Sequence, residues 1–270
     1  MIVDVHTHVF PDEIALEVVP KMAAGAGIKE SIDGRLSSLV ESMDEAGIEM
    51  SWLQPVATKP KQVNSINRWV ESGRSERVVA FGSFHPDCEN LPGLIRDLSS
   101  RGFPGVKMHP EYHTIEPDDE RLFAMYEAMI EERMIVLFHA GVDIEIPTLN
   151  STPEHFARLI DRFPDLAMIL AHLGGFRQWE EVARVLIGRD VYLDTSYVLG
   201  HLPDEDFVTM VRAHGADRVL FGTDSPWADQ KGELEHLRSL PFSEKELDNI
   251  CGENAARLLH HRLPPSRTEG

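Results

Sequence analysis

The first ten residues, MIVDVHTHVF, place two histidines, His6 and His8, two positions apart directly after a short apolar run. Successive side chains of a β-strand point to opposite faces, so residues at i and i+2 share one face. His6 and His8 would therefore lie side by side at the end of a strand over residues 2–5, an arrangement that suits a metal ion. Because the chain has 13 histidines in 270 residues, chance alone supplies roughly 0.6 such pairs, so the rest of the sequence must decide.

Ionisable residues also follow most of the later apolar runs. They are Lys107, His109 and Glu111 after one run, then His139, His172, Asp194 and Asp224, each after a further run. In a closed barrel the last strand lies beside the first, which brings Asp224 next to His6 and His8, with His139 across the mouth. Three imidazoles and a carboxylate gathered at one mouth are costly to desolvate, and a divalent cation offsets that cost.

The elements that must position these residues alternate regularly. Apolar, often β-branched runs predict buried parallel strands at residues 1–5, 51–57, 77–84, 105–108, 134–138, 166–171, 190–196 and 218–223. Helical spacing falls between them, at residues 35–47, 119–133, 151–165, 178–190, 204–218 and 243–261. Gly47 is expected to end the first of these helices, and Pro153, after Ser151 or Thr152, to begin the third.

This alternation predicts an α/β fold, a single (β/α)8 TIM barrel with the metal site at its C-terminal mouth. A doubly wound open sheet is the alternative, but no G-x-G-x-x-G turn follows the first strand. We expect one domain over residues 1–262 and a disordered, proline-rich polar tail over residues 263–270. Residues 9–35, with AAGAG at 23–27, are expected to form a flexible glycine-rich flap over the mouth or a disordered connector.

The motifs HTH, FHAG, AHLGG and FGTDSPW, in this order along the strands, resemble those of the amidohydrolase superfamily. More specifically, they resemble the amidohydrolase-2 branch, which contains aminocarboxymuconate-semialdehyde decarboxylase-like metal-dependent barrel enzymes. The resemblance runs from residue 1 to about residue 260. It implies that His6, His8, His139 and Asp224 hold the catalytic metal, and that His172 is the acid–base partner.

These residues predict a hydrolase of a small organic molecule with an amide, ester or lactone bond. A bound Zn²⁺ lowers the pKa of its water to about 7, and Asp224 and His172 can then move protons near neutral pH. The sequence has no nucleophile elbow. The alternative is a non-oxidative decarboxylase or other lyase acting on a small carboxylic acid. A metal-binding barrel without catalysis and a TatD-type nuclease are further alternatives, the nuclease being disfavoured by the acidic charge and by GVKMHP at the fourth strand.

Three further residues are predicted to bind substrate. Lys107 either pairs with a substrate carboxylate or with Glu111, or is carboxylated and bridges two metals; we favour the plain lysine and one metal ion per chain, Zn²⁺ or another divalent ion such as Mn²⁺. Glu111 is the candidate ligand for a second metal. Arg177 is predicted either to clamp an anionic group bidentately or to form a surface salt bridge. Second-rank candidates at the mouth are His85, His109, His113 and His201.

Composition limits the partners and the compartment. The formal net charge is −19 and no block of Lys or Arg occurs, which disfavours nucleic acid and anionic lipid as partners. The two cysteines, Cys88 and Cys251, are far apart, as expected in a reducing compartment. We see no signal peptide and no apolar run long enough to span a membrane, and expect a cytoplasmic protein with a small-molecule substrate. The resemblance also makes a homodimer plausible.

Overall fold

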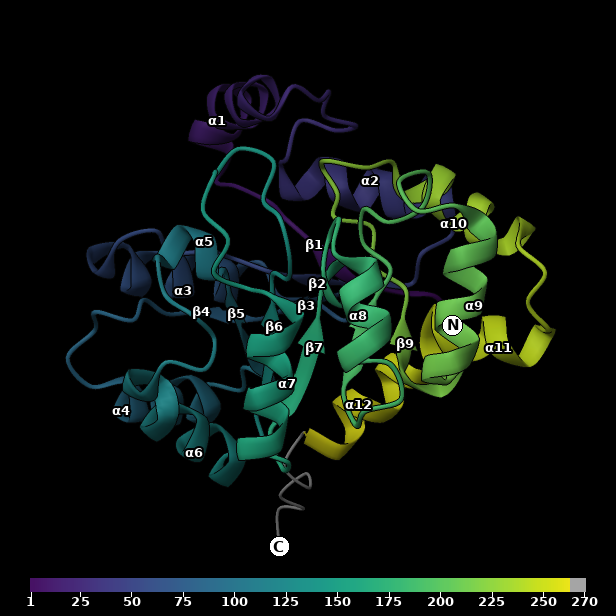
Figure 1. The fold of residues 1–270 in the computed structure, drawn as a ribbon. Helices are drawn as coiled ribbons and strands as arrows, with labels where there is room; N and C mark the ends of the chain where they lie inside the picture. Colours follow the sequence, from purple (N-terminus) through teal and green to yellow (C-terminus); the bar gives the residue numbers. More distant parts are fainter. Residues whose placement is uncertain (263–270) are drawn as a thin grey trace, which may run out of the picture.

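Nine parallel strands form the centre of the computed structural model, which describes residues 1–262 (Figure 1). They are β1 (Val3–Thr7), β2 (Met50–Leu53), β3 (Val78–Ala80), β4 (Gly82–Ser83), β5 (Gly105–Met108), β6 (Ile135–Phe138), β7 (Ala167–Leu170), β8 (Tyr192–Asp194) and β9 (Val219–Leu220). They pair in sequence order, β1 to β3 and β4 to β9. Every predicted strand is present, so the predicted positions are confirmed. The run at 77–84 is divided at Phe81 into β3 and β4, which count as one barrel strand.

The two sheets join at both edges and close the barrel. At one edge the amide of Phe81 donates to the carbonyl of Leu53 at 3.0 Å, which continues β2 pairing past the break. At the other, Val5 N donates to Phe221 O at 2.9 Å, so β1 lies against the segment that follows β9. The fold is therefore the predicted (β/α)8 barrel of α/β class.

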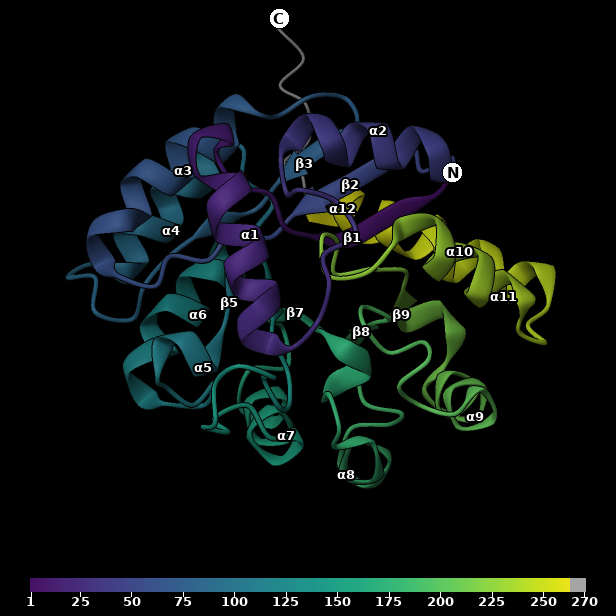
Figure 2. The same ribbon diagram turned by 90° about the horizontal axis from the view of Figure 1, so that it is seen from above.

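Helices surround the barrel (Figure 2). They are α1 (Asp12–Ala26), α2 (Leu36–Ala46), α3 (Val63–Ser72), α4 (Leu91–Ser100), α5 (Pro110–His113), α6 (Phe123–Glu131), α7 (Pro153–Arg162), α8 (Trp179–Val185), α9 (Asp204–His214), α10 (Gln230–Ser239), α11 (Glu244–Asp248) and α12 (Asn254–Arg262). Gly47 ends α2 with a left-handed φ of 70°, and α7 begins at Pro153 after Thr152, as expected. Each helix within residues 1–262 is too short or too polar to cross a membrane. The tail expected at 263–270 lies outside the described residues.

Strand alternation decides which side chains face the barrel axis. On β6, Ile135 and Leu137 belong to the apolar cluster inside the barrel, whereas Val136 and Phe138 pack with the helices outside. Val106 and Met108 of β5 likewise belong to the outer cluster. The intervening residue of β5, Lys107, therefore faces inward, because neighbouring side chains on a strand alternate.

The segment over residues 9–35 differs from the expectation of a glycine-rich flap. Residues 12–26 form α1, so the prediction of a loop there is wrong. Ala15, Val19 and Ala23, spaced four apart, are buried on one side of the helix, and this packing outweighs the local effect of the glycines. Gly27, at φ 68°, ends the helix. Seen from above, α1 lies across one end of the barrel (Figure 2).

A buried carboxylate fastens the first strand to the segment after the last one. Asp4 is fully buried, and its Oδ1 accepts from the amides of His6 (3.1 Å) and Thr223 (3.0 Å). Its Oδ2 accepts from the Thr223 hydroxyl at 2.6 Å and from Gln230 Nε2 at 2.7 Å. Burial raises the pKa of Asp4 to about 7, while these hydrogen bonds oppose the rise.

Removing this carboxylate should destabilise the barrel. We expect Asp4→Ala to lower the free energy of unfolding by about 3 kcal/mol or more, because several buried donors lose their acceptor at about 1–3 kcal/mol each. Urea denaturation followed by circular dichroism measures the change. Asp4→Asn, which keeps one side-chain oxygen and the volume, is the matched control and should lose less. A loss below about 1 kcal/mol in the alanine variant would contradict the proposed fastening.

A second buried carboxyl gives the stability a distinct pH dependence. Glu233 of α10 has a buried Oε2 that accepts no hydrogen bond within residues 1–262. Burial raises its pKa from 4.5 to about 8, helped by the negative charges of Asp4, Asp229 and Asp224. Above pH 4.5 the unfolded chain loses this proton while the folded chain keeps it, so stability falls as the pH rises from 4.5 to about 8.

Glu233→Gln should remove this pH-dependent loss. We expect the variant to exceed the wild type by about 1–3 kcal/mol near pH 8 and to match it near pH 4, where the wild-type carboxyl is protonated in both states. Thermal or urea unfolding across this range measures the difference. Equal slopes of unfolding free energy against pH in the two proteins would show that Glu233 does not cause the loss of stability.

Candidate metal centre and its cavity

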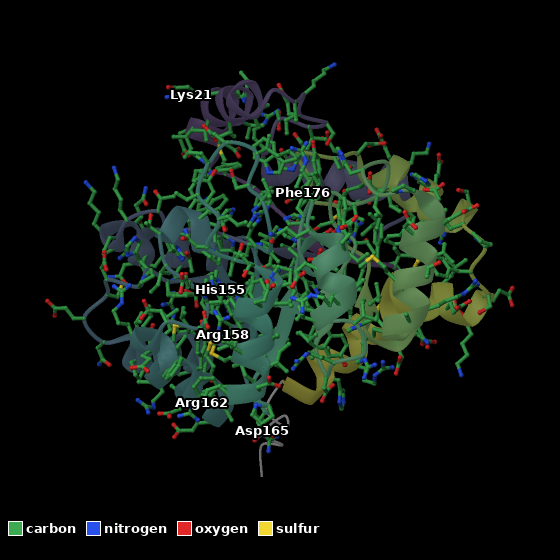
Figure 3. All side chains as sticks on the ribbon, in the orientation of Figure 1. Lys21, His155, Arg158, Arg162, Asp165 and Phe176 are labelled. Carbon is green, nitrogen blue, oxygen red and sulfur yellow. The ribbon has the colours of Figure 1, made fainter. Side chains whose placement is uncertain are left out.

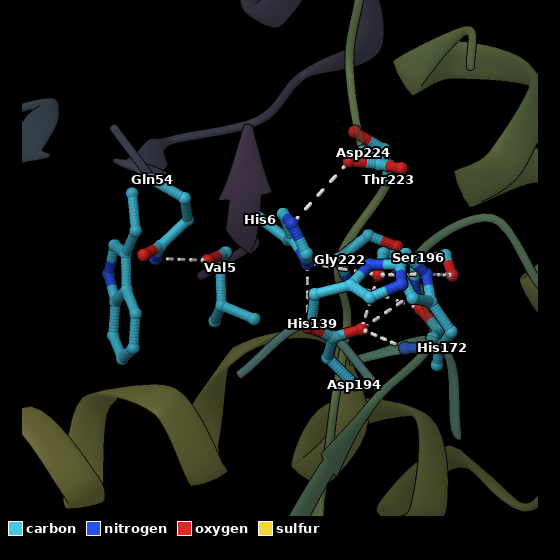
Figure 4. Close-up of polar contacts among 12 residues, drawn as sticks. Val5, His6, Gln54, His139, His172, Asp194, Ser196, Gly222, Thr223 and Asp224 are labelled. Carbon is cyan, nitrogen blue, oxygen red and sulfur yellow. Dashed lines mark hydrogen bonds and ion pairs between the residues drawn. The ribbon is translucent and has the colours of Figure 1, made fainter. Parts of the chain in front are cut away.

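Three potential metal ligands meet where β1 and β9 end. His6 Nε2 lies 3.1 Å from His8 Nε2 and 3.4 Å from Asp224 Oδ1, and His8 Nε2 lies 3.0 Å from the same oxygen. Ligand atoms placed about 2.0–2.2 Å from one cation, at octahedral to tetrahedral angles, are about 2.8–3.6 Å apart. The three atoms, here called the ligand triangle, therefore fit a divalent cation. Figure 4 shows His6 and Asp224 facing each other.

Barrel closure holds this triangle in place. Between Asp4 and Thr7 the register of β1 against β2 shifts, which is the point where His6 leaves the regular alternation. Asp224 N donates to His6 O at 2.8 Å, so the two ligand-bearing segments are joined through their backbones. Asp224 adopts a left-handed φ of 68°, an unfavourable conformation for a residue with a Cβ, and such strain is concentrated at functional sites.

A second carboxylate orients His6. Asp194, fully buried at the end of β8, has its Oδ2 2.9 Å from His6 Nδ1. An imidazole that donates Nδ1–H to a carboxylate keeps its Nε2 lone pair free, as metal-binding histidines usually do. The sequence placed Asp194 at a strand end but gave it no role. Its position directly after a strand, at the same mouth as the histidines, was the sequence signal that could have indicated a role in the site.

The protonation states also suit a cation. Burial holds the pKa of His6 well below 6.5, and the positive charge of Lys107 lowers it further. Burial alone would raise the pKa of Asp224, but His6, His8 and His172 lower it to about 2. At neutral pH His6 is therefore a neutral imidazole and Asp224 an ionised carboxylate, the forms that bind metals.

His172 and His139 lie beside the triangle as a pair. His172 Nδ1 is 2.8 Å from the carbonyl oxygen of Ser196, so this nitrogen carries the proton and Nε2 is the acceptor. Nε2 faces His139 Nδ1 at 3.1 Å. The centres of the His6 and His172 rings are 5.6 Å apart. His172 has a left-handed φ of 57°, as Asp224 does.

His139, predicted as the fourth ligand, belongs to a neighbouring group. Its ligand atoms cluster with those of His109 and Asp143, whereas the triangle consists of His6, His8 and Asp224. The rings of His109 and His139 are stacked, with centroids 4.1 Å apart. Burial lowers the pKa of both histidines well below 6.5. The ligand role of His139 stays a prediction, and sequence reasoning gave Asp143 no role.

Lys107 reaches the triangle from β5. Its side chain is fully buried, and Nζ lies 3.1 Å from His6 Nε2. Burial lowers its pKa to about 8, while Asp224, Asp194 and Glu111 act in the opposite direction. Lys107 therefore lies beside the ligand triangle, where its predicted role in substrate binding would place it.

The other two predicted substrate residues stand apart from the cavity described below. Glu111 lies behind His109 and His139: its Oε1 accepts from the Ser151 hydroxyl at 2.7 Å, and its Oε2, which accepts no hydrogen bond within residues 1–262, is 3.8 Å from His139 Nε2. Arg177 is exposed, with its guanidinium over the ring of Phe176, 5.1 Å from the centroid. Figure 3 marks Phe176 on the α1 side of the molecule, with Arg158, Arg162 and Asp165 farther toward the opposite end.

The triangle lies at the floor of a cavity of about 830 Å³. Its polar floor contains His6, His8, Lys107, His109, His139, His172 and Asp224. Apolar side chains from α1, α3 and the loop after β6 line its upper walls. Of the second-rank histidines, His109 lines this cavity, whereas His113 bonds Ala57 O through Nε2 at 3.1 Å outside it.

Comparison with known protein families and solved structures supports the family and the fold. The amidohydrolase family model matches residues 3–260. The chain belongs to the amidohydrolase family. The resemblance drawn from the strand-end motifs is thereby confirmed.

Solved structures share this fold at low sequence identity. An uncharacterised TIM-barrel protein from Bordetella bronchiseptica is 22% identical, covering 97% of this chain and 99% of its own, with a TM-score of 0.79. A 5-carboxyvanillate decarboxylase from Novosphingobium aromaticivorans with bound manganese is 13% identical. The match covers 96% of this chain and 97% of that protein, with a TM-score of 0.72. A 2,6-dihydroxybenzoate decarboxylase from Rhizobium is 20% identical. The match covers 96% of this chain and 98% of that protein, with a TM-score of 0.69. At these identities the likeness shows the barrel fold.

Removing two members of the triangle should remove the metal. We expect the wild type to hold about one transition-metal ion per chain, and the His6→Ala, His8→Ala double variant to hold almost none, because three ligand atoms are reduced to one. Elemental mass spectrometry of dialysed protein measures the content. His236→Ala, which removes an exposed histidine paired with Asp204, is the control and should keep the metal.

Circular dichroism must show that the double variant remains folded. Equal metal content in the wild type and the folded double variant would show that the triangle is not the site. A content near two per chain would point instead to a second ion near His109, His139 and Asp143.

Proposed function

We propose that this amidohydrolase-family protein is a metal-dependent hydrolase of a neutral amide, ester or lactone. The observation that carries the proposal is the ligand triangle of His6, His8 and Asp224, next to His172, whose Nδ1–H is bonded to Ser196 O so that Nε2 is the accepting nitrogen. We propose His139 as the fourth metal ligand. The ion is Zn²⁺ or Mn²⁺, one per chain, since imidazole and carboxylate suit both.

The chain's own residues supply the proton transfers. A divalent cation at the triangle would supply Lewis acidity, which lowers the pKa of water and polarises a carbonyl. Asp224, ionised at neutral pH, accepts a hydrogen bond from the attacking water and orients it. His172 takes the proton at Nε2 and returns it to the leaving group, while its Nδ1–H stays bonded to Ser196 O. Asp194 keeps His6 in one tautomer throughout.

The charges that line the cavity favour an uncharged substrate group away from the floor. Among its described lining residues Lys107 is the one Lys or Arg, whereas Asp143, Glu145 and Asp224 contribute carboxylates. Arg177, predicted either to clamp an anionic group or to form a surface salt bridge, is exposed and does not line the cavity. We place the reaction in the cytoplasm, because Cys88 and Cys251 are both free thiols.

A non-oxidative decarboxylase is the second candidate. Lys107 supports it, because a buried ammonium 3.1 Å from His6 Nε2 could hold a substrate carboxylate beside the triangle. Two of the structures that share this fold are named as decarboxylases of aromatic acids. In this case the substrate would lose its carboxylate as CO₂ and gain a proton at the same carbon, with no water consumed.

Isotope-labelled water separates the two reactions. The metal-loaded protein is offered neutral amides, esters and lactones, and separately aromatic carboxylic acids, in H₂¹⁸O. We expect a hydrolysed product that carries ¹⁸O in its new carboxyl group, measured by mass spectrometry. CO₂ release without ¹⁸O in the organic product would establish the decarboxylase instead, and no turnover of either set would contradict both.

The variant His172→Asn identifies the proton carrier. It should lower kcat by about 10²–10⁴-fold, the usual contribution of general acid–base catalysis, and leave the metal content unchanged. Unchanged kcat in this variant would remove His172 from the mechanism.

A further inference from the structure

The helix over the barrel mouth, α1, carries two apolar stripes, of which one is buried and the other lines the cavity. Ala15, Val19 and Ala23 form the buried stripe. Next to it, Ile14, Val18, Met22 and Ala26 are spaced four apart and line the cavity. Residues at i and i+4 lie on the same helix face, so these four form a continuous apolar wall along α1.

A second apolar wall faces the cavity from α3 and its approach. Ile66 and Trp69, three apart on α3, line the cavity and are half-buried. Pro55 and Val56, which follow β2, extend this wall toward the floor. Ile144, from the loop after β6, also lines the cavity and is 37% exposed.

The charges are distributed along the depth of the cavity. Lys107, the one Lys or Arg among the described lining residues, is fully buried at the floor, 3.1 Å from His6 Nε2. The upper part therefore offers no cation to a substrate anion. Glu145, on the loop after β6, adds negative charge there, which further disfavours an anionic group. The cavity thus combines a polar, ligand-rich floor with apolar upper walls.

The volume exceeds what a small polar substrate needs. At about 830 Å³ the cavity is near the upper end of the range of about 300–1,000 Å³ for small-molecule sites. A single-ring acid at the floor would leave most of the apolar walls in water. Burying apolar surface lowers the free energy by about 25 cal/mol per Å², so a substrate that covers these walls binds more tightly.

We infer that the substrate is a neutral amphiphile: an amide or ester whose carbonyl reaches the ligand triangle and whose apolar tail, an alkyl chain or aryl group, lies between α1 and α3. This inference deepens the proposed hydrolase function and rests on it for the identity of the head group. Val18 and Ile66, on opposite walls, are the specificity-determining residues.

Binding of neutral straight-chain primary amides from butanamide to octanamide to the metal-loaded protein tests the tail site. We expect Kd to fall with every added CH₂, by up to about fourfold, which corresponds to about 0.8 kcal/mol per buried CH₂. Titration calorimetry, with intrinsic tryptophan fluorescence as a second readout, measures the binding. A Kd that does not change with chain length would overturn the inference.

Substitutions on the two walls locate the tail. Val18→Asp and Ile66→Asp should each raise the Kd of octanamide by about tenfold or more, because the new carboxylate must be desolvated, and should change that of butanamide little. Leu16→Asp is the matched control: Leu16 is on the same helix, is 62% exposed and does not line the cavity. Its octanamide affinity should equal that of the wild type. An equal loss in all three variants would show that the tail does not lie between α1 and α3.

Hydrolysis is scored separately from binding. Chain-length-dependent binding without turnover of any amide or ester would leave the tail site standing and contradict the proposed function. Hydrolysis with a chain-length-independent Kd and kcat/KM would support the function and overturn the tail site.

Discussion

The meeting of β1 with the segment after β9 is the constraint on which the site depends. This seam joins residues more than two hundred positions apart, and it lies among the ligand atoms. Asp4 accepts hydrogen bonds from His6 N on one side and from Thr223 N and Oγ1 on the other. The next residue, Asp224, donates its amide to His6 O. Closing the barrel and assembling the ligand triangle are therefore the same event.

Next to this seam, hydrogen bonds between buried polar side chains fix the orientation of the site's histidines. Asp194 fixes the tautomer of His6, and it also accepts from His172 N at 3.1 Å through its other oxygen. One carboxylate thus holds both a ligand and the proposed acid–base histidine. Burial keeps His6 and His139 neutral, so their lone pairs remain available in the pH range where the carboxylate of Asp224 is ionised. The buried charge of Lys107 is tolerated because Asp224, Asp194 and Glu111 surround it.

Much of this arrangement could be predicted from the sequence, because strand ends converge in a barrel. The apolar runs located the strands, and barrel closure predicted that Asp224 would lie beside His6 and His8. What the sequence could not provide was side-chain direction beyond the strand ends. His139 faces His172 and clusters with His109, and the exposed guanidinium of Arg177 lies over Phe176. The glycines of AAGAG at 23–27 favour a loop, so the sequence did not predict the helix at 12–26, although Ala15, Val19 and Ala23 repeat at helical spacing.

Helix α1 belongs to an excursion of the chain over residues 10–34, and the two ends of this excursion are hydrogen-bonded to each other. Phe10 N donates to Gly34 O at 2.8 Å, just after His8 and just before α2. The chain thus leaves the barrel and returns to it at almost the same point. Between these two ends, Ser31 donates from N and Oγ to Pro226 O and from Oγ to Ala228 O, in the loop that follows Asp224. The barrel thus supplies the ligand triangle and the floor, while residues between 10 and 34 supply one wall of the cavity. Grafting another segment between residues 10 and 34, with Ser31 retained, would alter that wall and leave the ligand triangle in place.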